Sequence, residues 1–263
     1  MLSELKKKDY ATLLGTLCGV FSIIAAIGYD ATRLAMFMIF AGCFADLLDG
    51  YVARKTGEFN EFGIQLDSLS DAIVFGIAPS IIAFVTYAGK DTTDMGIASH
   101  HPLLMMVPTF LLIVGGIVRL AWFNVSEDKG SYEGVPVPVT ATILVLLMLA
   151  DYLSSLVSNG PNWFNYFMHY FVPIAMVILA WFNVSDRLKF GKTIRKKSGG
   201  MKFLFLFTGI FVTILAILVT FFRVQTSLYT LIMTLMLWPI WIWFITLGIK
   251  TANSLKKEKK KED

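Results

Sequence analysis

The chain has 263 residues, of which 56% are hydrophobic and only 16% are charged. A soluble domain of this length is near half apolar and a quarter charged, so the composition argues against a soluble protein. The formal net charge of +4 comes from short clusters of Lys and Arg. Basic stripes interleaved with aromatic residues are absent from the sequence, so nucleic acid is not expected as a partner.

The apolar residues are organised in long runs, which predict an all-α polytopic membrane protein with about eight transmembrane helices. Each run is close to the length that an α-helix needs to cross the hydrocarbon core, about 20 residues. In chain order, the expected spans lie near residues 11–28, 34–53, 67–88, 103–125, 136–157, 167–185, 203–222 and 227–249.

The Lys and Arg residues are distributed unequally between the two sides of these spans. Most of them lie on one side, in the basic start of the chain, residues 54–55, residues 186–202 and the Lys-rich tail. The other side has only Arg33, Lys90 and Arg223. The positive-inside rule therefore predicts a multi-pass protein of the cell membrane with both termini in the cytoplasm.

Four aspartates interrupt the apolar sequence of the second and third spans, at the ends that face the cytoplasm. They are Asp46, Asp49, Asp67 and Asp71. One aspartate at the centre of a lone spanning helix costs about 2.5–3.5 kcal/mol, so four without compensation approach roughly 10 kcal/mol. No cluster of Lys or Arg in the neighbouring spans offsets this charge. Bound divalent cations are therefore expected.

The spacing of the four acids supports a metal site. Asp46 and Asp49 are separated by three positions, and Asp67 and Asp71 by four, so each pair lies on one face of its helix. Two such pairs on neighbouring antiparallel helices form an all-oxygen set that suits Mg²⁺ or Mn²⁺. The alternative is that the acids cap helix ends at the membrane surface. That explanation fits one or two acids better than two helically phased pairs.

The residues around these acids resemble a known signature. The pattern Asp46-x2-Asp49-Gly50-x2-Ala53-Arg54-x8-Gly63-x3-Asp67-x3-Asp71 is similar to that of the CDP-alcohol phosphotransferase family. The resemblance implies a core of six helices, with the motif on the second and third, which we assign to residues 1–200. Residues 201–263 then form an additional two-helix hairpin with a Lys-rich cytoplasmic tail.

Other segments resemble the phosphatidylserine synthase branch of that family. They are FGIQLDSLSDAIVFGIAPS in the third span, DYATLLGTLCG in the first, GVPVPVTA in the fifth, and GGIVRLAWFNV in the fourth, where Trp122 replaces the usual Arg. This likeness implies transfer of the lipid phosphate group of CDP-diacylglycerol or CDP-archaeol to the hydroxyl of L-serine, with release of CMP. We also expect membrane lipids around the helices and a homodimer.

The resemblance carries roles to individual residues. Two Mg²⁺ or Mn²⁺ ions are expected on Asp46, Asp49, Asp67 and Asp71, and Asp71 is also expected to act as the catalytic base. The residues expected to bind the nucleotide or CDP-lipid are Thr12, Asp46, Gly50, Ala53, Arg54 and Gly63. Arg119 and Asn124, near the end of the fourth span, are candidates for binding serine.

Some of these assignments have alternatives. Gly50 and Ala53 either admit the nucleotide close to the helix backbone or only allow tight helix packing. Arg119 can bind the serine carboxylate through a bidentate fork, balance the acids, or extend to the membrane surface.

Two other functions fit parts of the sequence. A sibling phosphotransferase would use glycerol phosphate or inositol phosphate, and such acceptors need an additional basic pocket. A divalent cation transporter would also have acids within the membrane, but transporters usually repeat such features in both halves. Here the four acids lie in the first third of the chain, and only Asp151 stands in the later spans. This asymmetry favours an enzyme.

Overall fold

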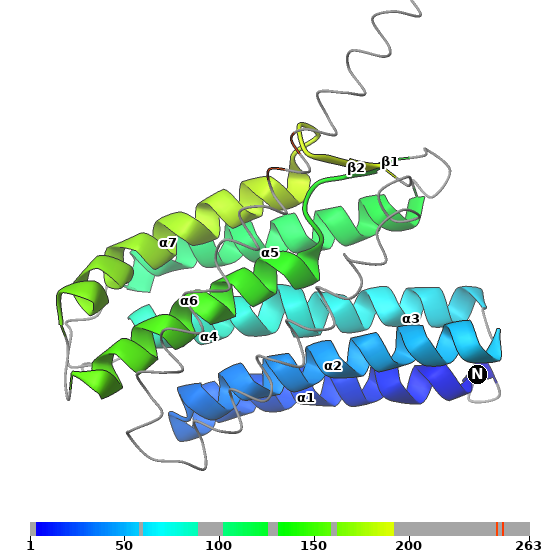
Figure 1. Ribbon diagram of the computed structural model, residues 1–263, viewed down its shortest axis with the longest axis horizontal. Coiled ribbons are helices and arrows are strands. Elements are labelled where there is room, and N and C mark those ends of the chain that lie inside the picture. Colours follow the sequence, from blue (N-terminus) through cyan, green and yellow to red (C-terminus); the bar gives the residue numbers. More distant parts are fainter. Residues whose placement is uncertain are drawn as a thin grey trace, which may run out of the picture.

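The computed structural model describes residues 4–57, 60–88, 102–125, 131–158 and 162–191, together with Thr246 and Ile249. Within these residues the chain forms a bundle of long helices (Figure 1). They are α1 (Lys7–Tyr29), α2 (Thr32–Thr56), α3 (Glu61–Asp71), α4 (Ala78–Ala88), α5 (Pro102–Val125), α6 (Val137–Val157) and α7 (Trp163–Val184). A π-helical turn, η2 (Ala72–Ile77), joins α3 to α4, so Glu61–Ala88 is one continuous helix.

Six helices of the described segments are long and apolar enough to cross a membrane. They match the first six predicted spans, so the polytopic α-helical class is confirmed. The third helix begins at Glu61, six residues before the predicted start of its span. The predicted spans at 203–222 and 227–249, and the hairpin assigned to 201–263, lie outside the described residues apart from Thr246 and Ile249.

Two short strands add a small β-element to the helices. β1 (Ser131–Glu133) and β2 (Lys189–Gly191) pair antiparallel, with Tyr132 opposite Phe190. The sequence analysis did not anticipate them. The pairing ties the segment before α6 to the segment after α7, and the backbone N–H of Val135 also donates to the carbonyl of Phe182 at 2.9 Å.

The ends of the first three helices have local causes. A capping box at α1 pairs Lys6 with Asp9, whose Oδ2 accepts the Lys6 backbone N–H at 2.8 Å. α2 ends at Gly57, which has φ +68°, a left-handed conformation that favours glycine. α3 begins at Asn60, whose Oδ1 accepts the Gly63 backbone N–H at 3.0 Å. These caps place the start of α1, the end of α2 and the start of α3 at one end of the bundle, on the right in Figure 1.

Small residues bring α1, α2 and η2 close together. α1 contains the pair Gly15 and Gly19, four residues apart, a spacing that lets membrane helices approach closely. A Cβ added at Gly19 would lie 3.0 Å from Val74 Cγ2, and one added at Gly42 of α2 would lie 2.6 Å from Val74 Cγ1. Val74 of η2 therefore fills the space that two glycines leave open.

The π-helical turn follows Asp71 directly. In this turn the Ala78 backbone N–H donates to the Ile73 carbonyl, five residues earlier, where an α-helix would use the carbonyl four residues earlier. Pro79, which has no N–H to donate, comes one residue later. π-turns inside α-helices are frequent at functional sites.

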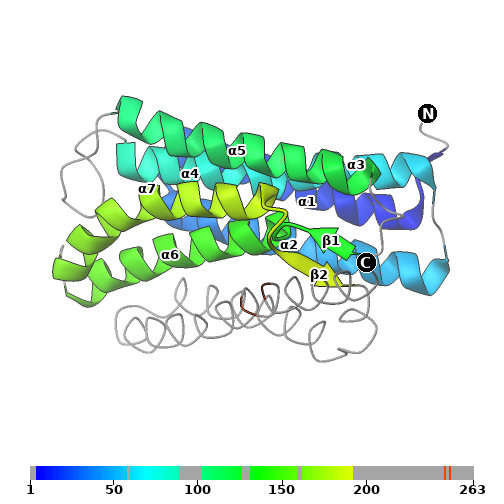
Figure 2. The same ribbon diagram turned by 90° about the horizontal axis from the view of Figure 1, so that it is seen from above.

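The remaining helices pack beside this trio. α5 and α7 run side by side (Figure 2), and a Cβ added at Gly115 of α5 would lie 3.0 Å from the carbonyl oxygen of Ala180 in α7. Both helices point toward the end of the bundle that holds the aspartates, so the last turn of α5 adjoins α3 there.

Candidate active site

Three aspartates come together where α2 approaches its end and α3 begins. One carboxylate oxygen from each of Asp46, Asp49 and Asp67 lies within 4.8 Å of the other two. Asp49 is buried, and the other two are partly buried. Asp71 lies one helical turn beyond Asp67 and interacts electrostatically with Asp46, Asp67 and Asp49. All four acids of the motif therefore share one site.

This set of side chains fits a divalent cation. Three carboxylates so close together repel one another unless a positive charge lies between them. The donor atoms are all oxygen, which hard cations such as Mg²⁺ and Mn²⁺ prefer. Asp46, Asp49 and Asp67 can therefore hold a metal ion, and Asp71 is near enough to extend the site.

Helix α1 positions the acids from the side. The Thr12 hydroxyl donates to Oδ2 of Asp49 at 2.7 Å. Ser70, which precedes Asp71, donates to the Thr12 carbonyl at 3.1 Å and accepts a hydrogen bond from Thr16 at 2.8 Å. Thr12, expected to bind the nucleotide, thus lies in the site as a partner of a metal-site carboxylate.

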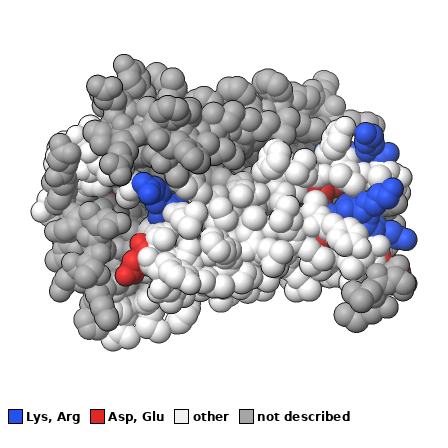
Figure 3. Space-filling view, turned by 90° about the horizontal axis from the view of Figure 1, so that it is seen from below, with Lys and Arg blue, Asp and Glu red and all other residues white. Residues whose placement is uncertain are grey.

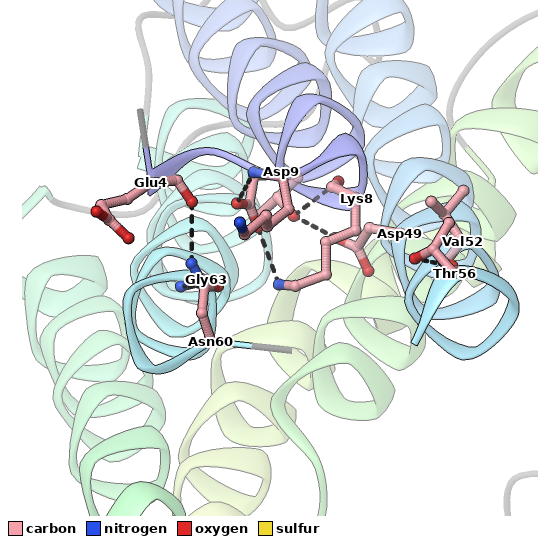
Figure 4. Close-up of polar contacts among 10 residues, drawn as sticks. Glu4, Lys8, Asp9, Asp49, Val52, Thr56, Asn60 and Gly63 are labelled. Carbon is pink, nitrogen blue, oxygen red and sulfur yellow. Dashed lines mark hydrogen bonds and ion pairs between the residues drawn. The ribbon is translucent and has the colours of Figure 1, made fainter. Parts of the chain in front are cut away.

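A buried lysine lies beside the acids, at the start of α1 (Figure 4). The ammonium of Lys8 is 2.9 Å from Oδ1 of Asp9 and interacts electrostatically with Asp49 and Asp67. The sequence analysis counted Lys8 only among the basic residues of the cytoplasmic side. No local signal separates it from its neighbours Lys6 and Lys7, because burial depends on the packing of α1 against α3.

Gly63 lies against this ion pair. A Cβ added there would overlap the ammonium of Lys8 and lie 2.6 Å from Oδ1 of Asn60 and 2.8 Å from Oδ1 of Asp9. The glycine that the motif fixes is therefore enclosed by the polar side chains at the starts of α1 and α3.

Gly50 has a different environment. The three heavy atoms nearest to an added Cβ all belong to the guanidinium of Arg54, the closest at 3.3 Å. Tight packing against another helix therefore does not explain this glycine. Ala53 is buried, whereas Arg54 is exposed. The open surface at Gly50 and the flexible cation beside it are suited to a phosphorylated ligand.

Arg119 and Asn124 occupy the last two turns of α5, on the side of α3. Arg119 is 9% exposed, its guanidinium lies 5.5 Å from the centre of the Phe123 ring, and it interacts electrostatically with Asp71. Its Nε has no hydrogen-bond partner among the described residues. Such burial argues against extension to the membrane surface and leaves the other two roles open.

Asn124 bonds to the helix that carries Asp67. Its Oδ1 accepts a hydrogen bond from the Ser68 hydroxyl at 3.0 Å, and its amide nitrogen donates to Oε1 of Gln65 at 3.4 Å. Neither Ser68 nor Gln65 was singled out from the sequence. Their positions on either side of Asp67 place them near the site, but only the packing of α5 on α3 gives them a common partner.

The order of helices and the convergence of the motif acids define a family of membrane proteins. Residues 9–181 match the CDP-alcohol phosphatidyltransferase family, and the chain belongs to it. The matched residues contain all four aspartates, Arg119 and Asn124.

The chain is similar to several proteins of known name. It is 38% identical over 136 residues to the CDP-diacylglycerol–serine O-phosphatidyltransferase of Helicobacter pylori, covering 51% of this chain and 53% of the relative. It is 33% identical to the archaetidylserine synthase of Methanothermobacter thermautotrophicus, in a match that covers 56% of this chain and 60% of the relative. It is 29% identical to the CDP-diacylglycerol–serine O-phosphatidyltransferase of Bacillus subtilis, in a match that covers 60% of this chain and 82% of the relative. The match to the first of these relatives therefore spans about half of its length.

Proposed function

We propose that this protein transfers the phosphatidyl or archaetidyl group of a CDP-lipid to the hydroxyl of L-serine and releases CMP. The observation that carries the proposal is the convergence of Asp46, Asp49 and Asp67 within 4.8 Å, in a chain of the CDP-alcohol phosphatidyltransferase family. The names of the relatives support serine as the acceptor. Because membrane phospholipids are the product, the protein acts in phospholipid biosynthesis.

The four acids have two tasks in this reaction. Asp46, Asp49, Asp67 and Asp71 hold divalent cations, two Mg²⁺ or Mn²⁺ ions, which when bound neutralise the charge of the CDP diphosphate. Asp71 also accepts the proton of the serine hydroxyl. The serine oxygen forms a bond to the lipid-side phosphorus as the bond from that phosphorus to the oxygen of CMP breaks.

The nucleotide lies over the last turns of α2. Gly50 offers a surface without a side chain, next to buried Ala53, and the Arg54 guanidinium, 3.3 Å from the position of a Cβ at Gly50, can donate to phosphate oxygens. Thr12 holds Asp49 in place beneath it.

The acceptor lies between the acids and α5. Arg119 is buried, interacts with Asp71 and has an unpartnered Nε within the described segments, so it can bind a carboxylate next to the base. Asn124, held by Ser68, supplies a neutral polar group at the same end of α5.

The site faces the cytoplasm, in a cell membrane. Figure 3 shows most of the Lys and Arg surface of the visible face at one end of the molecule, the end on the right, where the aspartates lie. The positive-inside rule supports a cytoplasmic position for that end.

A cation transporter is the alternative from another class, and the surroundings of Asp151 argue against it. Its carboxylate accepts hydrogen bonds from Tyr87 at 2.8 Å and from the Asn165 amide at 2.7 Å. These bonds connect α4, α6 and α7, so the carboxylate has a structural role. A second acidic ion site along a path through the bundle finds no support in the part of the chain that is described.

The experiment that tests the function is a measurement of CMP release from CDP-diacylglycerol and CDP-archaeol by the purified protein. Serine is compared with glycerol phosphate, inositol phosphate and ethanolamine as acceptors. We expect serine-dependent release that EDTA abolishes and that Mg²⁺ or Mn²⁺ restores. Release that requires glycerol phosphate or inositol phosphate would establish the sibling activity, and full turnover without metal would contradict the role of the acids.

A further inference from the structure

The side chain of Lys8 is buried inside the acidic end of the bundle. The residue is only 7% exposed, and lysines are almost never this buried unless they are paired. Its ammonium forms an ion pair with Asp9 at 2.9 Å, and Asp9 is its one bonded partner within the described residues. An ammonium has three N–H donors, so donors remain for a ligand.

Two features hold this ammonium in position. Asp9 is itself fixed, because its second oxygen accepts the Lys6 backbone N–H at 2.8 Å in the capping box of α1. On the other side, the ammonium occupies the space that a side chain at Gly63 would fill. Figure 4 shows Lys8 extending from α1 toward the first turn of α3, where Asn60 and Gly63 lie.

The charges around Lys8 are those of the metal site. It interacts electrostatically with both Asp49 and Asp67, one from each helix of the motif. A diphosphate that approaches these carboxylates is repelled by them, so a cation within the cluster contributes attraction at the point where repulsion is greatest. An ammonium is a compact charge that suits a phosphate oxygen.

We propose that Lys8 is a donor-binding residue, whose ammonium contacts the diphosphate of the CDP group, and that Gly63 is glycine to leave room for it. This inference rests on the proposed function, in which the donor is a CDP-lipid. It changes the role expected for Gly63, which serves the nucleotide through Lys8 and not by direct contact. The competing role for Lys8 is a counter-charge that only neutralises the acids.

The first test measures binding of CDP to the purified full-length protein, at Mn²⁺ concentrations that saturate each variant. Lys8→Met keeps most of the side-chain volume and removes the charge. We expect the affinity for CDP to fall about 10- to 150-fold, the loss of one charged hydrogen bond. Lys7→Met is the matched control, since Lys7 is the exposed neighbour on the same turn, and it should bind CDP nearly as the natural protein does. Lys8→Arg should recover part of the loss.

The second test is a double-mutant cycle with Gly63→Ala. The added methyl displaces the Lys8 ammonium, so the single substitution should also weaken CDP binding. In the Lys8→Met background the same substitution should cost much less, because the group it displaces is gone. The cycle also separates this effect from any disturbance of the Asn60 cap, which is common to both backgrounds.

The outcomes separate the two roles. If Lys8→Met changes Mn²⁺ affinity but binds CDP as tightly as Lys7→Met at saturating metal, Lys8 is a counter-charge and the proposal is overturned. Equal losses from Gly63→Ala in both backgrounds overturn the role given to Gly63. If thermal unfolding shows that Lys8→Met is not folded, Lys8→Gln gives the same comparison. Because CDP binding needs no acceptor, a failure of serine-dependent CMP release would leave this test intact.

Discussion

At the level of single residues, Asp71 differs from the other motif acids in its surroundings. Asp46, Asp49 and Asp67 share one set of converging oxygens, and Asp49 is held by Thr12. Asp71 lies one turn further along, at the boundary with the π-helical turn, and interacts with Arg119. This position fits the proposed role of Asp71 as the base, with the other three acids as the proposed metal ligands.

The two positions predict different defects. Asp71→Asn should reduce turnover about 100-fold or more, the usual contribution of a general base, while CDP-lipid binding is largely retained. Asp46→Asn removes the negative charge from one of the three converging side chains, so both binding and turnover should fall. Turnover and CDP-lipid affinity measured for both variants test this. Equal binding defects in the two variants would remove the separate role of Asp71 as base.

Arg119 is the residue that we expect to make the proposed site specific for serine among acceptors. Lys cannot reproduce two parallel hydrogen bonds to a carboxylate, so Arg119→Lys should raise the KM for serine about 10- to 150-fold. The KM for CDP-lipid should change little. The natural protein should also discriminate against ethanolamine, which has no carboxylate. If the substitution alters only metal affinity or folding, Arg119 balances the acids and does not bind serine.

Among the structural elements, the π-helical turn η2 packs tightly against two other helices, α1 and α2. Val74 is 1% exposed and packs between Gly19 of α1 and Gly42 of α2. The same turn begins directly after Asp71. The packing of α1 and α2 on this one valine therefore helps to fix the height and rotation at which Asp71 enters the site.

A substitution in α2 tests this packing. In Gly42→Ala the added Cβ would lie 2.6 Å from Val74 Cγ1, so we expect destabilisation by about 1–3 kcal/mol from overpacking. Gly28→Ala is the matched control, because nothing lies within 4 Å of a Cβ there, and alanine is the better helix former by about 0.5–1 kcal/mol. Thermal unfolding in detergent measures both. Val74→Ala should cost less stability in the Gly42→Ala background than in the natural protein, and equal costs in the two backgrounds would locate the cause elsewhere.

At the level of the whole molecule, the two ends of the bundle have different chemistry. One end gathers the four motif acids with Lys8, Arg54 and Arg119 around them. Toward the other end, Asp151 is engaged by Tyr87 and Asn165 and holds three helices together. The proposed reaction would therefore be confined to one membrane surface, where a nucleotide and an amino acid dissolved in water can reach it.

Sidedness can be measured by cysteine labelling, in a background where Cys18 and Cys43 are replaced by Ser. Lys55 is exposed at the aspartate end, and Asp30 is exposed at the opposite end. In intact cells, a membrane-impermeant maleimide should modify Asp30→Cys but reach Lys55→Cys only after lysis. The reverse pattern would place the aspartates outside the cell and contradict the positive-inside argument.

The sequence alone determined where the spans lie and which of the motif aspartates share a helix face. Crossing lipid requires about 20 apolar residues in a helix, so the first six predicted spans agree with the observed helices, with the start of the third as the largest difference. Helical periodicity likewise put Asp46 and Asp49 on one face, and Asp67 and Asp71 on another. These are local properties, and one helix at a time is enough to determine them.

Contacts between helices were decided only by the tertiary structure. Thr12 and Asp49 are 37 residues apart, and Ser68 and Asn124 are 56 apart, so no local pattern pairs them. Lys8 reads in the sequence as one of three consecutive lysines, and only the approach of α1 to α3 buries it while Lys7 stays exposed. Val74 of the π-helical turn fits between glycines of two other helices. Composition and spacing predict which kinds of atoms form the site. Packing decides which residues those atoms contact, because it brings together residues that are far apart in the chain.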